Sequence, residues 1–183
     1  VKSFSQDDSH IFCTKDQIES EILSFLNLLQ EVYEDFGFEK PTFYLSLRPE
    51  NRTGNDDMWD HSESVMKSIL EKSGMEFSIQ DGEGAFYGPK IDITVPDALE
   101  REWQLGTVQL DFFASDKFGL NYINKDGDKE NVVLIHRAIF GSLERFFGIL
   151  IEHFGGSFPL WLSPDQFSLI PISENHFEHC KNI

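Results

Sequence analysis

The chain has 183 residues, which is enough to bury one hydrophobic core. Hydrophobic residues make up 40% of it and include 18 Phe, a content that supports a folded domain and argues against disorder. The net charge of −17 excludes a general basic surface for nucleic acid, although a local basic site stays open. Cys13 and Cys180 have no CxxC spacing and predict two free thiols rather than a disulfide framework.

Targeting signals are not visible in the sequence. No run of 18 apolar residues is present, so no membrane span is expected. The chain does not open with a charged and then apolar leader, which makes the cytoplasm the expected compartment. It begins at Val1 and stops within a periodic helical pattern, so we expect a piece of a longer protein.

Helical and strand patterns alternate along the chain. Thr14 and Gln17 form a capping box that predicts the start of the first helix. Apolar residues at helical spacing, each run followed by glycine, predict helices over 18–36, 58–72 and 136–154. Alternating or short apolar runs predict strands over 1–4, 42–47, 75–79, 90–95, 102–113, 120–123 and 131–135.

The order of these elements predicts the fold class. A turn over 124–128 predicts that the last two of these strands pair as a hairpin. Strands joined by turns, with helices set apart, are typical of an antiparallel sheet of the α+β class. Beyond them, 167–170 predicts a strand and 174–183 a helix capped by Ser173. We therefore expect two domains, 1–157 and 158–183.

The segment 102–112 has the pattern of a strand but carries unusual residues. Gln104 and Gln109 bring polar amides, and Gly106 has no side chain. Glycine weakens a strand and usually marks the close approach of a ligand or another backbone. This strand is therefore a candidate floor for a polar ligand pocket.

Several titratable residues are open to both a structural and a functional interpretation. His10 and His136 are too far apart in sequence for a local metal motif, and each could be an ordinary structural or surface histidine. We expect His136 at the junction between a strand and the third helix. Asp8 could belong to a solvated loop. Spacing alone does not predict an enzyme.

Six blocks, taken together and in order, resemble the threonyl-tRNA synthetase family of class II aminoacyl-tRNA synthetases. They are Gln-Asp-Asp-Ser-His-Ile-Phe-Cys-Thr (6–14), Leu-Arg-Pro-Glu-Asn-Arg-Thr-Gly (47–54), Met-Trp-Asp (58–60), Glu-Gly-Ala-Phe-Tyr-Gly-Pro-Lys-Ile-Asp (83–92), Trp-Gln-Leu-Gly-Thr-Val-Gln-Leu-Asp-Phe (103–112) and Ile-His-Arg-Ala-Ile-Phe-Gly-Ser-Leu-Glu-Arg-Phe (135–146). The tail over 158–166 resembles the start of the family's anticodon-binding domain. Long blocks in the right order are far more specific than one short motif.

The resemblance implies a class II synthetase sheet flanked by helices. Residues 1–157 would be the C-terminal part of the catalytic domain, from the end of motif 2 through motif 3, and 158–183 the beginning of the anticodon-binding domain. The implied activity is ATP-dependent activation of threonine and its transfer to tRNA(Thr) by a ligase that is a homodimer when complete. Implied cofactors are Zn²⁺, and Mg²⁺ with ATP. The alternatives are another class II synthetase and a non-catalytic module that keeps the fold.

The family binds a zinc ion through one Cys and two His. His10 and His136 match the two histidines, whereas the matching Cys lies upstream of Val1 and Cys13 does not align with it. Three protein ligands leave an open position, which the family uses for the amino and hydroxyl groups of threonine. Asp8 matches the residue that accepts the hydrogen bond of the threonine hydroxyl, a group that an apolar pocket discriminates poorly. Other matches to the threonine pocket are Gln6, Tyr87 and Gln109.

The resemblance also implies a nucleotide side. Phe4 matches the aromatic residue that stacks on adenine, and Gln104 and Thr107 match residues near the ribose and the adenylate. Arg145 matches the motif 3 arginine that meets the terminal phosphates of ATP. Lys90 matches a lysine near the adenylate and the tRNA end. Arg145 and Lys90 are therefore the expected catalytic residues.

The position of Arg145 allows a structural alternative. It lies beside the apolar stripe of the predicted third helix, so we expect it to project over the sheet near Gln104 and Thr107. The alternative is a buried ion pair with Glu83 or Asp111.

Three features depart from the family pattern. Leu105 stands where family members often carry Cys, and Lys2-Ser3 replaces the more usual Arg-Gly. Motif 1 and the first half of motif 2, with its α-phosphate arginine, would lie before Val1. The chain alone is therefore expected to be incomplete as an enzyme.

Overall fold

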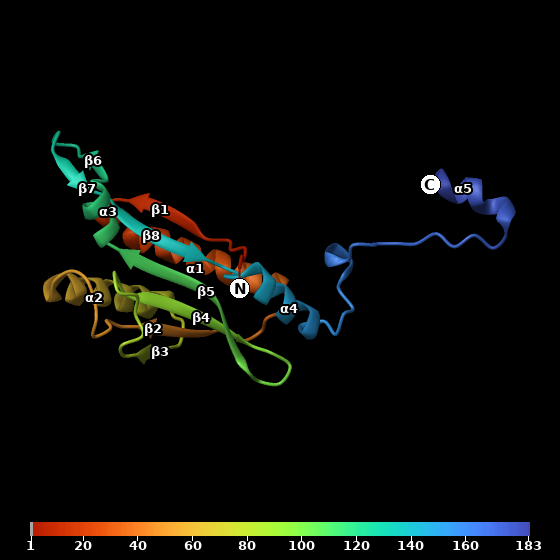
Figure 1. The fold of residues 1–183 in the computed structure, drawn as a ribbon, viewed down its shortest axis with the longest axis horizontal. Helices are drawn as coiled ribbons and strands as arrows, with labels where there is room; N and C mark the ends of the chain where they lie inside the picture. Colours follow the sequence, from red (N-terminus) through yellow and green to blue (C-terminus); the bar gives the residue numbers. More distant parts are fainter. Residues whose placement is uncertain (1) are drawn as a thin grey trace.

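A computed structural model describes residues 2–183 and has a six-stranded sheet at its centre (Figure 1). The strand order is β1-β8-β5-β4-β2-β3, and adjacent strands are antiparallel except β2 and β3, which are parallel. The strands are β1 (Ser9–Cys13), β2 (Thr42–Ser46), β3 (Phe77–Gln80), β4 (Lys90–Pro96), β5 (Glu102–Asp111) and β8 (Val133–Ala138). The predicted α+β class with a mostly antiparallel sheet is confirmed.

Helices cover one face of this sheet. The α-helices are α1 (Ile18–Asp35), α2 (Asp56–Ser73), α3 (Phe113–Phe118), α4 (Leu143–His153) and α5 (Phe177–Lys181). Short 3-10 helices are η1 (Lys15–Gln17), η2 (Leu160–Leu162) and η3 (Glu174–His176). The apolar sides of α1 and α2 share one core with the inward residues of β2, β4, β5 and β8. Each fully buried Leu or Ile in that core contributes about 1.5–3 kcal/mol through lost water contact.

Strand alternation leaves the opposite face of the sheet polar. In β4, Ile91 and Ile93 are fully buried in the core, so Lys90 and Asp92, which alternate with them, point to the other face. The ends predicted at glycine for the first two helices are confirmed: Gly74 follows α2 directly and Gly37 follows α1 after Phe36, and both glycines have positive φ. The core packing of the sheet therefore determines where the side chains of its polar face lie.

Gly106 serves the core rather than a ligand. A Cβ at this position would lie 2.7 Å from Leu29 Cδ1 and 2.9 Å from the Tyr33 hydroxyl oxygen. Both neighbours come from α1, so the close approach that the glycine predicts is made by helix side chains. The Tyr33 hydroxyl in turn donates a hydrogen bond of 2.7 Å to the carbonyl of Ile139.

The predicted helix over 136–154 is wrong in its first part. β8 continues to Ala138 because it has a paired strand on each side, β1 and β5, to satisfy its backbone groups. The chain then turns through Gly141, which has a φ of 64°, and Ser142 caps α4 by accepting from the amide of Arg145. His136 therefore lies within a strand and not at a helix junction.

Other boundaries also differ from the sequence patterns. The predicted hairpin forms between β6 (Asn121–Ile123) and β7 (Lys129–Asn131). Its second strand is shorter than the predicted strand over 131–135, because the chain from Val133 onward joins the large sheet as β8. The strand expected over 167–170 is irregular, since no neighbouring strand among residues 2–183 pairs with it. Residues 2–4 are also irregular, and residue 1 lies outside the described residues. β1 and α3 were not predicted.

The C-terminal segment extends away from the sheet. Figure 1 shows the chain after η2 running outward to α5, far from the body of the molecule. Near its start, Trp161 of η2 packs on Phe36, with 5.2 Å between ring centroids. Within residues 2–183 no helix is both long enough and apolar enough to cross a bilayer.

The packing around Gly106 generates a stability prediction. Gly106→Ala should lower the free energy of unfolding by about 1–3 kcal/mol, because the new methyl group overpacks the contact with α1. Gly148→Ala is the matched control, since no atom lies within 4 Å of a Cβ built there and alanine favours a helix. Urea unfolding of the two variants measures the difference. Equal stability of both variants would contradict the assigned packing.

Candidate functional site

The strand register brings distant polar residues into one row across the open face of the sheet. His10 lies directly opposite His136, which lies opposite Gln109 on its other side. Gln109 is paired with Lys90, and Lys90 with Ser46. Five strands therefore each contribute one side chain to the row. A shift of one residue in any pairing would turn that side chain into the core.

The two histidines at one end of the row are in contact. Their ring centroids are 4.4 Å apart in an edge-to-face arrangement. Imidazole nitrogens are common metal ligands, so this contact brings two candidate ligands together. Among the described residues no group of three or more His, Cys, Asp or Glu is arranged to hold a metal, so the pair alone does not complete a site.

Cys13 does not supply a third ligand. It is 5% exposed and belongs to the hydrophobic core beneath the sheet. Burial raises the pKa of the Cys13 thiol to about 11, with smaller contributions from Glu21 and Asp16. The thiol therefore stays protonated at neutral pH, whereas a metal binds the thiolate.

Asp111 contacts His136 and was missed as a site residue by the sequence analysis. Its Oδ2 lies 2.9 Å from His136 Nε2, and its Oδ1 accepts from the amides of Phe113 and Ala114 at 2.8 and 2.9 Å. Burial acts to raise the pKa of this carboxyl, but the hydrogen bonds from His136 and the two amides outweigh it, so the pKa is lowered. The group is a carboxylate at neutral pH.

Tyr87 completes the neighbourhood of the histidine pair. Its hydroxyl donates to Gln109 Oε1, and its ring centroid lies 5.3 Å from that of His136. Burial raises the pKa of Tyr87 to about 12, with further contributions from the charges of Asp111 and Asp8. Tyr87 is therefore an uncharged phenol at neutral pH. Asp8 itself has an exposed side chain.

Asp92 organises the middle of the open face. It is 5% exposed and accepts hydrogen bonds from Gln104 Nε2 at 2.6 Å, from Ser46 Oγ at 2.9 Å and from Thr107 Oγ1 at 3.3 Å. Lys90 Nζ lies 2.8 Å from its Oδ2. Asp92 was not predicted as a site residue, although an acidic residue inside an otherwise apolar strand is a signal of a buried polar contact.

Arg145 reaches the sheet from the first turn of α4. Its Nη1 donates to the carbonyl oxygen of Gln104 at 3.2 Å, and its Cζ lies 5.8 Å from the centroid of the Trp103 ring. The alternative ion pair with Glu83 or Asp111 is wrong, because the ion pairs of the described residues do not include it and Asp111 faces His136. The side chain is exposed, which leaves most of its donors open to solvent.

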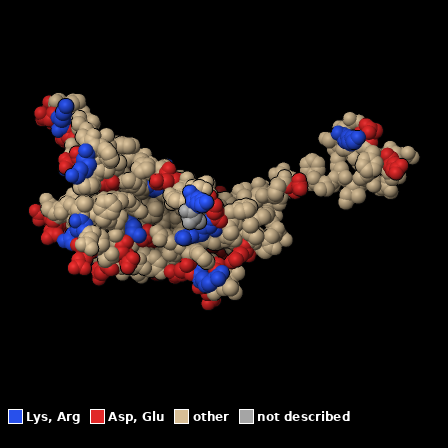
Figure 2. Space-filling view, in the orientation of Figure 1, with Lys and Arg blue, Asp and Glu red and all other residues tan. Residues whose placement is uncertain are grey.

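The segment before β1 is held against the turn that leads into α4. The Asp7 carboxylate accepts from the amides of Ile139 and Phe140 at 2.7 and 3.1 Å. Gln6 forms an isolated bridge with Ser142. Phe4, just before them, is 59% exposed. Figure 2 shows several Lys and Arg side chains near the centre of this view, with acidic side chains spread around them.

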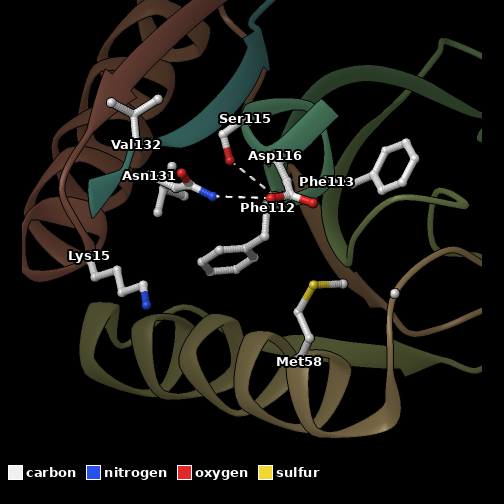
Figure 3. Close-up of a pocket in the computed structure, with 10 residues that line it drawn as sticks. Lys15, Met58, Phe112, Phe113, Ser115, Asp116, Asn131 and Val132 are labelled. Atoms are coloured by element: carbon white, nitrogen blue, oxygen red, sulfur yellow. Dashed lines mark hydrogen bonds between the residues drawn. The ribbon is translucent and has the colours of Figure 1, made fainter. Parts of the chain in front are cut away.

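A separate hollow lies between α2 and α3 (Figure 3). It has a volume of about 310 Å³ and is lined by ten residues, among them Lys15, Met58, Phe112 and Asn131. The row formed by His10, His136, Gln109, Lys90 and Ser46 does not contribute to its lining. The polar chemistry of the molecule therefore lies on the open face and not in this hollow.

Comparisons with known proteins agree with one another. The chain is 51% identical to a threonine–tRNA ligase of Thermotoga maritima and 50% identical to one of Anaplasma marginale, in both cases over all 183 residues. It spans only 28% and 29% of the length of these two curated relatives.

A solved structure shows the same fold. The RNA-binding domain of threonyl-tRNA synthetase from Cryptosporidium parvum Iowa II superposes with a TM-score of 0.93 at 44% identity, over 98% of this chain and 45% of that one. The model of the class II core domain of tRNA synthetases (G, H, P, S and T) matches residues 1–154. Since that match covers most of the sequence, the chain belongs to the family of class II tRNA synthetase core domains.

Proposed function

We propose that this chain forms part of the catalytic core of a threonine–tRNA ligase, which activates threonine with ATP and transfers it to tRNA(Thr). The observation that carries the proposal is the direct pairing of His10 with His136 beside Gln109 and Tyr87 on the open face. Residues this far apart in sequence converge on one polar row, and the relatives that share the whole chain are named for this activity.

The row would bind threonine at its histidine end. His10 and His136 would hold a zinc ion together with a cysteine from outside this chain. The ion would supply a Lewis acid for the amino and hydroxyl groups of the substrate. Asp8 would accept the hydrogen bond of the hydroxyl, and Gln109, oriented by the Tyr87 hydroxyl, would present its amide to the substrate. Gln6 would line the same pocket.

The Asp92 side of the face would bind the nucleotide. Phe4 would stack on adenine, while Gln104 and Thr107 would contact the ribose and the adenylate. Attack of the threonine carboxylate on the α-phosphate expels pyrophosphate, and this step needs positioning and positive charge rather than covalent help. Arg145 would supply charge at the terminal phosphates, together with the Mg²⁺ that accompanies ATP.

Lys90 would act close to the adenylate and the tRNA end. Its ammonium is held 2.8 Å from the buried Asp92 carboxylate, which also holds Gln104 and Thr107. Asp92 would therefore position three substrate-contacting residues at once. The remaining parts of the reaction, including the homodimer and tRNA recognition, would come from regions outside this chain, and the complete ligase would act in the cytoplasm.

Zinc content tests the metal proposal. In a full-length ligase that carries this sequence, His10→Ala or His136→Ala should lower zinc from about one ion per chain to well below half, because each variant removes one of three protein ligands. His61→Ala, at an exposed position on α2, is the control and should keep its zinc. Zinc that stays stoichiometric in both site variants would contradict the assignment.

Discrimination against valine tests Asp8. Asp8→Ala should strongly reduce activation of threonine and hardly change activation of valine, since valine offers no hydroxyl to the lost carboxylate. Threonine- and valine-dependent pyrophosphate exchange would measure both rates. Asp165→Ala, which removes an equal charge from the exposed tail, should change neither rate. Equal losses with the two amino acids in Asp8→Ala would exclude the proposed role.

Phosphate recognition tests Arg145. Arg145→Lys keeps the charge but loses the planar fork, so adenylate formation should fall by about 100-fold while the melting temperature hardly changes. Arg101→Lys is a matched control, because the Arg101 Cζ lies 5.6 Å from the centroid of the same Trp103 ring. A large fall in melting temperature, with normal activity per folded molecule, would instead assign Arg145 a structural role.

A further inference from the structure

Asp111 ends β5 and uses its two carboxylate oxygens for different purposes. Oδ1 accepts from the backbone amides of Phe113 and Ala114, which starts α3 directly after the strand. Oδ2 faces His136 Nε2 at 2.9 Å. The two amide hydrogen bonds fix the orientation of the carboxylate, so the second oxygen meets the imidazole in a set geometry.

The chemistry of the pair determines which nitrogen of His136 carries a proton. An ionised carboxylate only accepts hydrogen bonds, so the nitrogen that faces Asp111 must be a donor. In the neutral imidazole that donor is Nε2–H, which leaves the lone pair on Nδ1. Within residues 2–183, Nδ1 of His136 makes no protein hydrogen bond. It is therefore the nitrogen available to a metal.

The surroundings of the ring restrict its rotation. His136 lies on a strand that is paired on both sides. The Tyr87 ring lies 5.3 Å away between centroids and the His10 ring 4.4 Å away. These contacts leave little room for a ring flip, which would replace Nε2 by a carbon at the position that faces Asp111.

We propose that Asp111 is a positioning residue that holds His136 in the Nε2–H tautomer, with Nδ1 as the metal-binding nitrogen. The inference rests on the proposed zinc site and adds Asp111 as the residue that orients one zinc ligand, His136. A carboxylate on the second nitrogen of a metal-binding histidine also raises the basicity of the first, and loss of such a partner lowers metal affinity about 10–100-fold.

Asp111→Asn separates this role from the capping of α3. The two backbone amides require an oxygen, so the side-chain carbonyl of Asn should stay on them and the cap should remain. The amide NH₂ then faces His136 and donates, which forces the proton of the imidazole onto Nδ1. The substitution thus reverses the tautomer while it changes few contacts.

The experiment uses a full-length ligase that carries this sequence. ¹⁵N NMR of the zinc-free protein, labelled at histidine, should show His136 as the Nε2–H tautomer in the wild type and as the Nδ1–H tautomer in Asp111→Asn. Zinc affinity, measured by competition with a chelator, should fall about 10–100-fold in the variant. The melting temperature without zinc should change little.

Asp97→Asn is the matched control. Asp97 Oδ1 also accepts from two backbone amides, those of Leu99 and Arg101, and its Oδ2 accepts from the indole nitrogen of Trp103 at 2.9 Å. The same substitution there turns an amide NH₂ toward Trp103 and Arg101, which also donates to Asp97 Oδ2, and it acts away from the histidines. It should leave both the His136 tautomer and zinc affinity unchanged, whatever its effect on stability.

Two results would overturn the inference while the zinc site itself stands. One is an Nδ1–H tautomer of His136 in the wild type, and the other is an unchanged zinc affinity in Asp111→Asn. A wild-type protein that binds no zinc would instead overturn the metal site, and with it the metal-preparing role of Asp111, whatever tautomer His136 shows.

Discussion

The pairing of β8 with both β1 and β5 is the constraint on which the rest of the site depends. Only this central position places His136 between His10 on one side and Gln109 on the other. Because side chains alternate along a strand, the same pairing that buries Ile135 in the core turns His136 to the open face. Core packing and strand pairing therefore set the position of the polar row.

Two buried carboxylates stabilise the polar face by different means. Asp92 is surrounded by side-chain donors from three strands, whereas Asp111 is held mainly by backbone amides and one imidazole. A buried charge without partners would cost several kcal/mol, so each carboxylate needs its full set of donors. The donors are in turn fixed in place. The polar surface is therefore held in one geometry by its own hydrogen bonds.

The sequence predicted the parts of the fold in which local pattern and tertiary pairing agree. Apolar periodicity placed α1 and α2 within a few residues, and alternation placed β2 and β4. It failed at His136, where a helical pattern begins inside a strand whose two neighbours are supplied by distant segments. The residues of the histidine pair came from resemblance to a family, since no local spacing connects them. Asp92 and Asp111 were missed because Ser46, a partner of Asp92, and His136, a partner of Asp111, come from strands that are distant in sequence.

The consecutive residues Asp7 and Asp8 illustrate how a structural contact can determine a functional one. Asp7 accepts hydrogen bonds from the amides of Ile139 and Phe140 with its carboxylate, whereas the side chain of the neighbouring Asp8 is exposed. The hydrogen bonds of the Asp7 carboxylate therefore restrict the backbone from which the Asp8 side chain extends. Under the role proposed above for Asp8, loss of the Asp7 contact would weaken recognition of threonine, although Asp7 itself binds main-chain amides of the protein.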